Sequence, residues 1–434
     1  MLQLKKQMLR KTMRKFELQT AVSTVLAIIA GAVPLIIVPP FGDTLYMPKL
    51  MTIEVLVFGL LLLYVRPITA YFSEKPKIPL PVKLVLLYLL CVTVTLPFST
   101  DIMLSLKGRS FRLESYSAIL FYGILMMLGA FFYTFKRWHV RLYAVGVSCV
   151  AVYGIFQKFG LDFQPQDPLM YGGPGASYAT IGNPNFLGSF LTLALPILLY
   201  AFIKGPRAYL LPCGLVYFCL LCTNTRGAWI GSFLGFVLLG VFLLREKENR
   251  RRFAVASGVF VLLTFIFLFV NTGFGARFLS VFTDLSKIIK GNDWEKGGSY
   301  RLFIWSKTLE LIKLRPLTGF GIETLGKVMG QYFERDIVRV TGHHLVIDRA
   351  HNEYLHIAVS SGIPAAFTYL AFEGTTLYQG FKSWRQSPML IPLVCSVSAY
   401  MAASCFNISV VTVAPVFWIF CGIMVRLSNK INQI

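Results

Sequence analysis

Residues 348–355 read Asp348-Arg-Ala-His-Asn-Glu-Tyr-Leu355 and close a polar run over residues 271–352. Apolar segments lie directly on both sides of this run, at residues 253–270 and 353–378. An apolar run of about 20 residues is long enough to cross a lipid bilayer as a helix. We therefore expect a large loop between two membrane helices, and we expect the aqueous chemistry of the protein in that loop.

The remainder of the 434-residue chain has the composition of a membrane protein. Its residues are 56% hydrophobic and 14% charged, whereas about one quarter of the residues of a soluble globular domain are charged. Apolar segments that indicate membrane helices fall at about residues 18–38, 49–65, 80–97, 116–135, 140–157, 184–203, 208–223, 227–244, 253–270, 353–378, 388–406 and 411–427.

These segments predict an all-α polytopic membrane protein with about twelve transmembrane helices. Helices 1–9 are expected in residues 1–270. A large extracytoplasmic loop that contains short amphipathic helices is expected in residues 271–352, and helices 10–12 in residues 353–434.

Positive charge is distributed unevenly between the loops. The net charge is +22, from 42 Lys and Arg against 20 Asp and Glu, a balance that in a soluble protein would indicate nucleic acid. In a membrane protein, Lys and Arg collect in the cytoplasmic loops. Strongly basic groups alternate here with weakly charged loops along the chain, so we expect both termini in the cytoplasm, residues 271–352 outside, and no nucleic-acid partner.

One loop departs from this alternation. Lys107, Arg109 and Arg112 fall in a loop that lies outside by the count of segments, although it is basic. Such a loop either violates the charge rule or binds an anionic group. The sequence leaves both interpretations open.

Three basic residues near the predicted outer surface are candidates for function. Arg226 lies between two apolar runs with almost no loop, and is either an interfacial Arg whose head reaches water or a charge with a role. Arg301 lies in the first turn of a predicted helix, where a cation opposes the helix dipole, and is either a solvated residue or a ligand for an anion. His351 borders the tenth apolar segment and is either structural or a general base at neutral pH.

Two helix starts are predicted from local signals. Asn183-Pro184 has the pattern of an N-cap followed by Pro in the first helical position. A second helix is expected over residues 299–315, with Ser299 as its N-cap and Pro316 after its end. Its apolar residues form one stripe, which consists of Leu302, Trp305, Leu309 and Ile312. This helix is expected on the membrane surface or packed under the loop.

Patterns of other protein classes are missing from the sequence. The spacing of His343, His344, His351 and Asp348 matches no metal motif, so we expect no metal. The chain has no Gly-rich phosphate loop of an ATP-driven pump. Few acidic residues lie in the apolar segments, whereas ion-coupled transporters generally have more. A transporter or flippase stays open as the alternative to an enzyme.

Four short motifs occur in order in the second half of the chain. They are Asn183-Pro-Asn-Phe-Leu187, Thr225-Arg-Gly-Ala-Trp229, Tyr300-Arg-Leu-Phe-Ile-Trp305 followed by Pro316-Leu-Thr-Gly-Phe-Gly321, and His351-Asn-Glu-Tyr-Leu355 followed by Gly362-Ile363. Together with a long loop before the tenth segment, they resemble the O-antigen ligase and O-antigen polymerase superfamily of bacterial envelope enzymes. The resemblance covers about residues 182–362 and the overall topology.

The resemblance implies an inverting, metal-independent glycosyltransferase that needs no cofactor. Its donor would be an undecaprenyl-pyrophosphate-linked oligosaccharide at the outer face of the bacterial cytoplasmic (inner) membrane. The family's two functional arginines fall on Arg226 and Arg301, which would bind the pyrophosphate, and its functional histidine falls on His351. Many relatives have an acidic residue where this chain has Ser360-Ser361, so no acidic catalytic residue is expected there.

The resemblance leaves the reaction partly open. The acceptor would be a glycan, a lipid or the cell wall, and the protein would act as a surface-polysaccharide ligase or as a polymerase. A polysaccharide or lipid-linked glycan transporter is the alternative. Aromatic side chains of the loop would stack on sugars or fill the loop's own core, namely Trp294, Tyr300, Phe303, Trp305, Tyr332 and Phe333.

Overall fold

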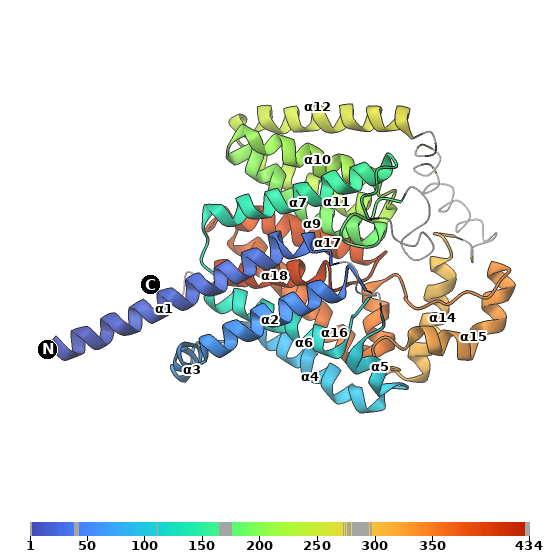
Figure 1. Cartoon of the computed structure of the whole chain (residues 1–434), viewed down its shortest axis with the longest axis horizontal. Coiled ribbons are helices and arrows are strands. Elements are labelled where there is room, and N and C mark those ends of the chain that lie inside the picture. Colours follow the sequence, from blue (N-terminus) through green and yellow to red (C-terminus); the bar gives the residue numbers. More distant parts are fainter. Residues whose placement is uncertain are drawn as a thin grey trace.

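The computed structural model describes residues 2–38, 43–110, 112–164, 176–271 and 297–429, with positions 273, 275, 279 and 295 between the last two ranges. Helices joined by turns make up this described part, which contains no strand (Figure 1). The bounds of the α-helices are α1 (Leu2–Gly31), α2 (Met47–Leu63), α3 (Val65–Ser73), α4 (Leu80–Thr95), α5 (Ile102–Lys107), α6 (Tyr116–Phe132), α7 (Arg137–Lys158), α9 (Pro184–Lys204), α10 (Leu210–Cys222), α11 (Arg226–Leu243), α12 (Lys247–Val270), α14 (Arg301–Leu314), α15 (Leu325–Thr341), α16 (Glu353–Ser383), α17 (Leu390–Ser404) and α18 (Ala414–Ser428).

The structure confirms an all-helical chain with helices suited to a membrane. Within the described residues, seven helices are long and apolar enough to cross a bilayer, and an eighth span results if α2 and α3, which meet at a bend of 66°, count as one. Shorter apolar helices occupy the other predicted segments, at Tyr116–Phe132, Arg207–Cys222, Leu390–Ser404 and Ala414–Ser428. The count of twelve crossings and the division into three regions stay predictions.

Helix α9 lies at the centre of the bundle. Of its apolar window, 89% is buried, against 22% for α12 at the edge (Figure 1), because α9 is apolar on all sides and α10, α11 and α17 surround it. The predicted helix start is confirmed: Asn183 Oδ1 accepts a hydrogen bond from Asn185 N at 2.9 Å, and Pro184 takes the first helical position.

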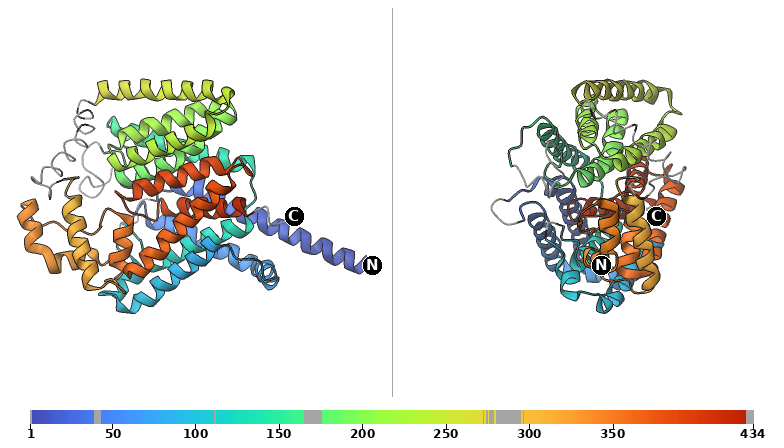
Figure 2. Two further views of the ribbon diagram at one scale, coloured as in Figure 1. Left: turned by 180° about the vertical axis from the view of Figure 1, so that it is seen from behind. Right: turned by 90° about the vertical axis from the view of Figure 1, so that its right-hand side faces the viewer.

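The α14–α15 pair projects from one end of the bundle. Figures 1 and 2 show α14 and α15 at the end opposite to the N-terminal half of α1. The large polar segment predicted from the sequence includes these two helices, together with residues between 272 and 296 that mostly lie outside the described part of the chain.

The long helix α16 is interrupted at Gly362. This residue has a φ of 84°, and the backbone of the segment Pro316-Leu-Thr-Gly-Phe-Gly321 lies against the interruption. Phe320 N donates to Val359 O at 2.8 Å, Gly321 N to Ser360 O at 2.9 Å, and Ile363 N to Pro316 O at 2.7 Å. Two motifs that are 41 residues or more apart in sequence, those ending at Gly321 and beginning at Gly362, are thereby joined through their backbones.

The same segment also contacts the first half of the chain. Thr100 N and Thr100 Oγ1 donate to Phe320 O at 2.8 and 2.9 Å, and Ser105 Oγ donates to Ile322 O at 2.8 Å. Residues 316–322 therefore connect α16 to α5 and position the loop that follows α5.

Replacing Gly362 by Ala should destabilise the protein. A Cβ atom at this position would lie 2.2 Å from Leu317 O, and a non-glycine residue at positive φ costs about 1–3 kcal/mol before that clash is counted. We expect a clearly lower thermal unfolding temperature in detergent. The matched control is Gly374→Ala in the same helix, where a Cβ meets no atom within 4 Å. Equal melting of the two variants would contradict this account of the interruption.

Candidate functional site

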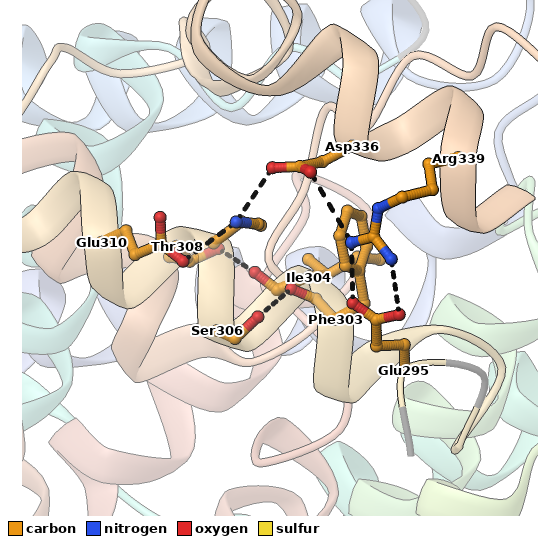
Figure 3. A network of polar contacts seen from close by, with 9 residues as sticks. Glu295, Phe303, Ile304, Ser306, Thr308, Glu310, Asp336 and Arg339 are labelled. Carbon is orange, nitrogen blue, oxygen red and sulfur yellow. Dashed lines mark hydrogen bonds and ion pairs between the residues drawn. The ribbon is translucent and has the colours of Figure 1, made fainter. Parts of the chain in front are cut away.

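One ion pair joins α14 to α15, and further ion pairs extend from it. Lys307 Nζ lies 3.0 Å from Asp336 Oδ2 and 3.1 Å from Glu310 Oε1. Arg339 lies 3.0 Å from Glu295 and 3.6 Å from Asp336 (Figure 3). Solvent-exposed pairs contribute little individually, but a network with several members has more effect. The network thus links α15 to α14, and α14 in turn packs on α16.

Helix α14 begins differently from the prediction. It starts at Arg301, and its N-cap is Tyr300 rather than Ser299, without a side-chain capping hydrogen bond. The backbone before it has positive φ at Gly298, Ser299 and Tyr300, at 62°, 61° and 65°. For a residue other than glycine this backbone conformation costs free energy, and such residues are frequently found at functional sites.

The predicted apolar stripe of α14 is only part of its buried surface: Ile312 is buried, and Leu302 and Trp305 are half-buried. Leu309 is 47% exposed, whereas Phe303, Ile304 and Leu311 are buried. Helix α14 is apolar on more than one side, and its contact with α16 decides which side is buried. The periodicity of apolar residues within one segment does not predict its contact with a distant helix.

Arg226 reaches the start of α14. It is the first residue of α11, and its Nη2 donates to Ser299 Oγ at 3.2 Å. Ser299 lies two residues before Arg301. The two arginines, which are 75 positions apart in sequence, therefore belong to one region of the structure.

His351 lies two residues before the first residue of α16 and has a φ of 50°. Its two neighbours are fixed by hydrogen bonds. Trp305 Nε1 of α14 donates to Ala350 O at 3.0 Å. Asn352 caps α16, since its Oδ1 accepts from Leu355 N at 3.0 Å, while its Nδ2 donates to Cys405 O at 3.1 Å. The backbone around His351 is thus held between α14 and the end of α17.

The surroundings of His351 favour the neutral imidazole. Burial lowers its pKa to about 4, and the positive charges of Arg301 and Arg112 act in the same direction, while Asp348 opposes them. His351 Nδ1 is buried and has no hydrogen-bond partner in the described part of the chain. A neutral ring with an available nitrogen is the form that can accept a proton.

The structure therefore brings together the three predicted site residues. Arg226 bonds to the strained turn before Arg301, and Arg301 lies close enough to His351 to lower its pKa. Of the aromatic candidates, Phe303 is buried at 1% exposure and Trp305 supports the backbone before His351. Trp294 lies outside the described residues.

Further charged residues surround His351 that were not among the predicted site residues. Arg109 Nη1 and Arg112 Nη2 lie 3.8 and 3.3 Å from Asp348 Oδ2. Burial alone would raise the pKa of Asp348, but Arg112, Arg349 and Arg109 hold it below its ordinary value. The one sequence signal for this cluster was the basic character of the loop that carries Arg109 and Arg112.

Arg349 is a buried residue next to this cluster. It is 1% exposed and makes an ion pair with Glu323, which is 1% exposed at its side chain. Arg349 Nη1 also lies 3.2 Å from His356 Nε2. Removing one member of such a pair leaves an uncompensated buried charge, so Arg349 and Glu323 have a structural role next to the site.

A comparison with protein-family models gives one match. Residues 211–370 match the family described as O-antigen ligase. The matched domain is similar to the O-antigen ligases. The match confirms the resemblance to the O-antigen ligase superfamily and contains Arg226, Arg301 and His351. The domain indicates a ligase-type or polymerase-type function in a membrane. A search of curated proteins found no match.

His351 should titrate far below an ordinary histidine. The chain has five histidines, so the ring signals of labelled protein can be assigned by nuclear magnetic resonance with a His351→Gln variant. We expect a midpoint near pH 4 instead of about 6.5. In Arg301→Gln the midpoint should rise, because the positive charge of Arg301, which disfavours protonation of the ring, is then absent.

The control for this titration is Arg339→Gln. Arg339 is exposed, and its ion-pair partners are Glu295 and Asp336, so its loss should leave the midpoint of His351 in place. A wild-type midpoint at or above 6.5 would contradict the electrostatic description of the site.

Proposed function

We propose that the protein is an inverting, metal-independent glycosyltransferase that takes a glycan from undecaprenyl pyrophosphate at the outer face of the cytoplasmic membrane. The observation that carries the proposal is the convergence of Arg226, Arg301 and His351 within the O-antigen ligase domain. Both termini are then cytoplasmic, and the partners are the lipid-linked donor, a glycan, lipid or cell-wall acceptor, and the bilayer.

In this proposal the arginines bind the leaving group. Breaking the bond between sugar C1 and the pyrophosphate oxygen transfers the bonding electrons to that oxygen. Guanidinium groups fixed nearby stabilise the developing negative charge, and their planar donors match phosphate oxygens in pairs. The chain's own side chains thus supply the positive charge that the leaving group requires.

His351 is proposed as the general base for the acceptor hydroxyl. The proton moves from this hydroxyl to the imidazole while the hydroxyl oxygen bonds to C1 from the side opposite to the pyrophosphate, which inverts the configuration. Before the donor binds, a pKa of about 4 makes His351 a weak base. The negative charge of the bound donor offsets Arg301 and Arg112 and raises that pKa, so the base becomes effective when the donor is in place.

Transfer activity should depend on all three residues. We expect His351→Ala to lose about 10²–10⁴-fold in rate, the usual contribution of general-base catalysis. Arg226→Ala and Arg301→Ala should each lose about 10²–10³-fold, as for removal of one group that stabilises transition-state charge. The measurement is the initial rate of transfer from a defined lipid-linked oligosaccharide by purified protein.

Two exposed residues of α15 and the turn after it serve as matched controls. His344→Ala removes an imidazole whose side chain is 78% exposed, and Arg335→Ala removes an exposed guanidinium. Both should keep wild-type rates. Full activity of His351→Ala would contradict the role of His351 as the base. Full activity of both Arg226→Ala and Arg301→Ala would contradict their binding of the pyrophosphate.

The products separate the forms of the reaction. A ladder of lengthening lipid-linked glycans identifies a polymerase, and one transfer to a separate acceptor identifies a ligase. Mass spectrometry of the lipid-linked glycans before and after incubation provides the test against a transporter. If the covalent structure of the glycans is unchanged while they cross the membrane of a vesicle, the glycosyltransferase proposal fails.

A further inference from the structure

The loop after α5 brings two guanidinium groups to the region of His351. Arg109 and Arg112 come from the first half of the chain, outside the matched residues 211–370. Both contact Asp348, three positions before His351. Hydrogen bonds of Thr100 and Ser105 to the segment 316–322 fix α5, from which this loop starts.

The guanidinium group of Arg112 also contacts an aromatic ring. Its guanidinium carbon lies 5.4 Å from the centre of the Phe186 ring, and Phe186 is 3% exposed in the first turn of α9. A cation held over an aromatic face is attracted by the ring quadrupole. This contact gives a physical role to the motif Asn183-Pro-Asn-Phe-Leu187, which places Phe186 under Arg112.

The contacts with Asp348 leave positive charge available. The side chains of Arg109 and Arg112 are 42% and 25% exposed, and both approach one oxygen of Asp348, at 3.8 and 3.3 Å. Charge-assisted hydrogen bonds of this kind are normally about 2.7–2.9 Å long. Two guanidinium groups therefore share one carboxylate loosely, which leaves one excess positive charge on side chains that are not fully buried.

We propose that Arg112, with Arg109 beside it, forms a second phosphate-binding site next to His351, distinct from Arg226 and Arg301. The proposal rests on the proposed function, because the lipid-linked donor carries a pyrophosphate and a lipid-linked acceptor carries phosphate as well. A partly buried guanidinium suits phosphate, since its planar donors bind two oxygens at once. Arg109 and Arg112, two of the basic residues that depart from the charge alternation, then have a ligand, whereas Lys107 lies in α5 outside the site.

The transfer reaction identifies which substrate supplies the phosphate. Initial rates of Arg112→Gln are measured against donor concentration at saturating acceptor, and against acceptor concentration at saturating donor. We expect one of the two KM values to rise about 10- to 100-fold, as for loss of a hydrogen bond to a charged group. A higher donor KM assigns the site to the donor pyrophosphate, and a higher acceptor KM to the acceptor phosphate. Unchanged KM values for both substrates would overturn the proposal.

Lys107→Gln is the matched control, because it removes one positive charge from an exposed residue at the end of α5, close to the loop. Both of its KM values should stay within about twofold of wild type. If Arg112→Gln does not fold, Arg112→Lys replaces it. Lys keeps the charge but lacks the paired donors, so an intermediate rise in the same KM is expected, and wild-type KM values would overturn the proposal.

A binding measurement tests the second site without the transfer reaction. Inorganic pyrophosphate is titrated into labelled full-length protein, and the His351 ring signal is followed. In the double variant Arg226→Ala/Arg301→Ala the signal should still shift, and addition of Arg112→Gln should abolish the shift. If the double variant alone abolishes it, the second site is wrong. Because this readout needs no turnover, a failure of the proposed glycosyl transfer leaves it informative.

Discussion

The geometry around His351 depends on the interruption of α16 at Gly362. A helix that is broken inside a membrane leaves backbone donors and acceptors without partners, and each costs several kcal/mol unless the protein satisfies it. Here the backbone of residues 316–321 satisfies them, through bonds of 2.7 to 2.9 Å to both sides of the break. The close approach requires glycine in both contacting segments. A Cβ on Gly319 would lie 2.5 Å from the backbone of Ser360, and one on Gly362 would lie 2.2 Å from Leu317 O.

This contact places three charged segments at the same end of the bundle. It fixes the turn between α14 and α15, and thereby the position of Arg301 relative to His351. Through Phe320 O and Ile322 O it also fixes α5 and the loop with Arg109 and Arg112. Below these residues, the buried pair of Arg349 and Glu323 holds the backbone before His351. The arginines of the region surround a histidine that stays neutral, which is a suitable arrangement for binding a strongly anionic substrate and for accepting a proton.

The residues that match the O-antigen ligase family do not contain all the charge around His351. Residues 211–370 supply Arg226, Arg301, His351 and the buried pair. The first half of the chain supplies Arg109 and Arg112, and Phe186 of α9 supports Arg112. Helix α9 is almost fully buried at the centre of the bundle, so its first turn offers a rigid support for a side chain that faces the site.

The sequence alone determined the helical class, the location of the apolar segments, the capped start of α9 and the three candidate residues, because these follow from composition, local capping and short motifs. It did not determine which side of α14 is buried, where that helix begins, or that Arg112 and Asp348 lie beside His351. Those features result from contacts between residues far apart in the chain: α14 against α16, the turn before Arg301 against Arg226, and the loop after α5 against the segment 316–322. The sequence did show that the loop with Arg109 and Arg112 is basic where the charge pattern predicts a weakly charged loop. Only the tertiary structure showed that these arginines contact Asp348, because that contact joins residues far apart in the chain.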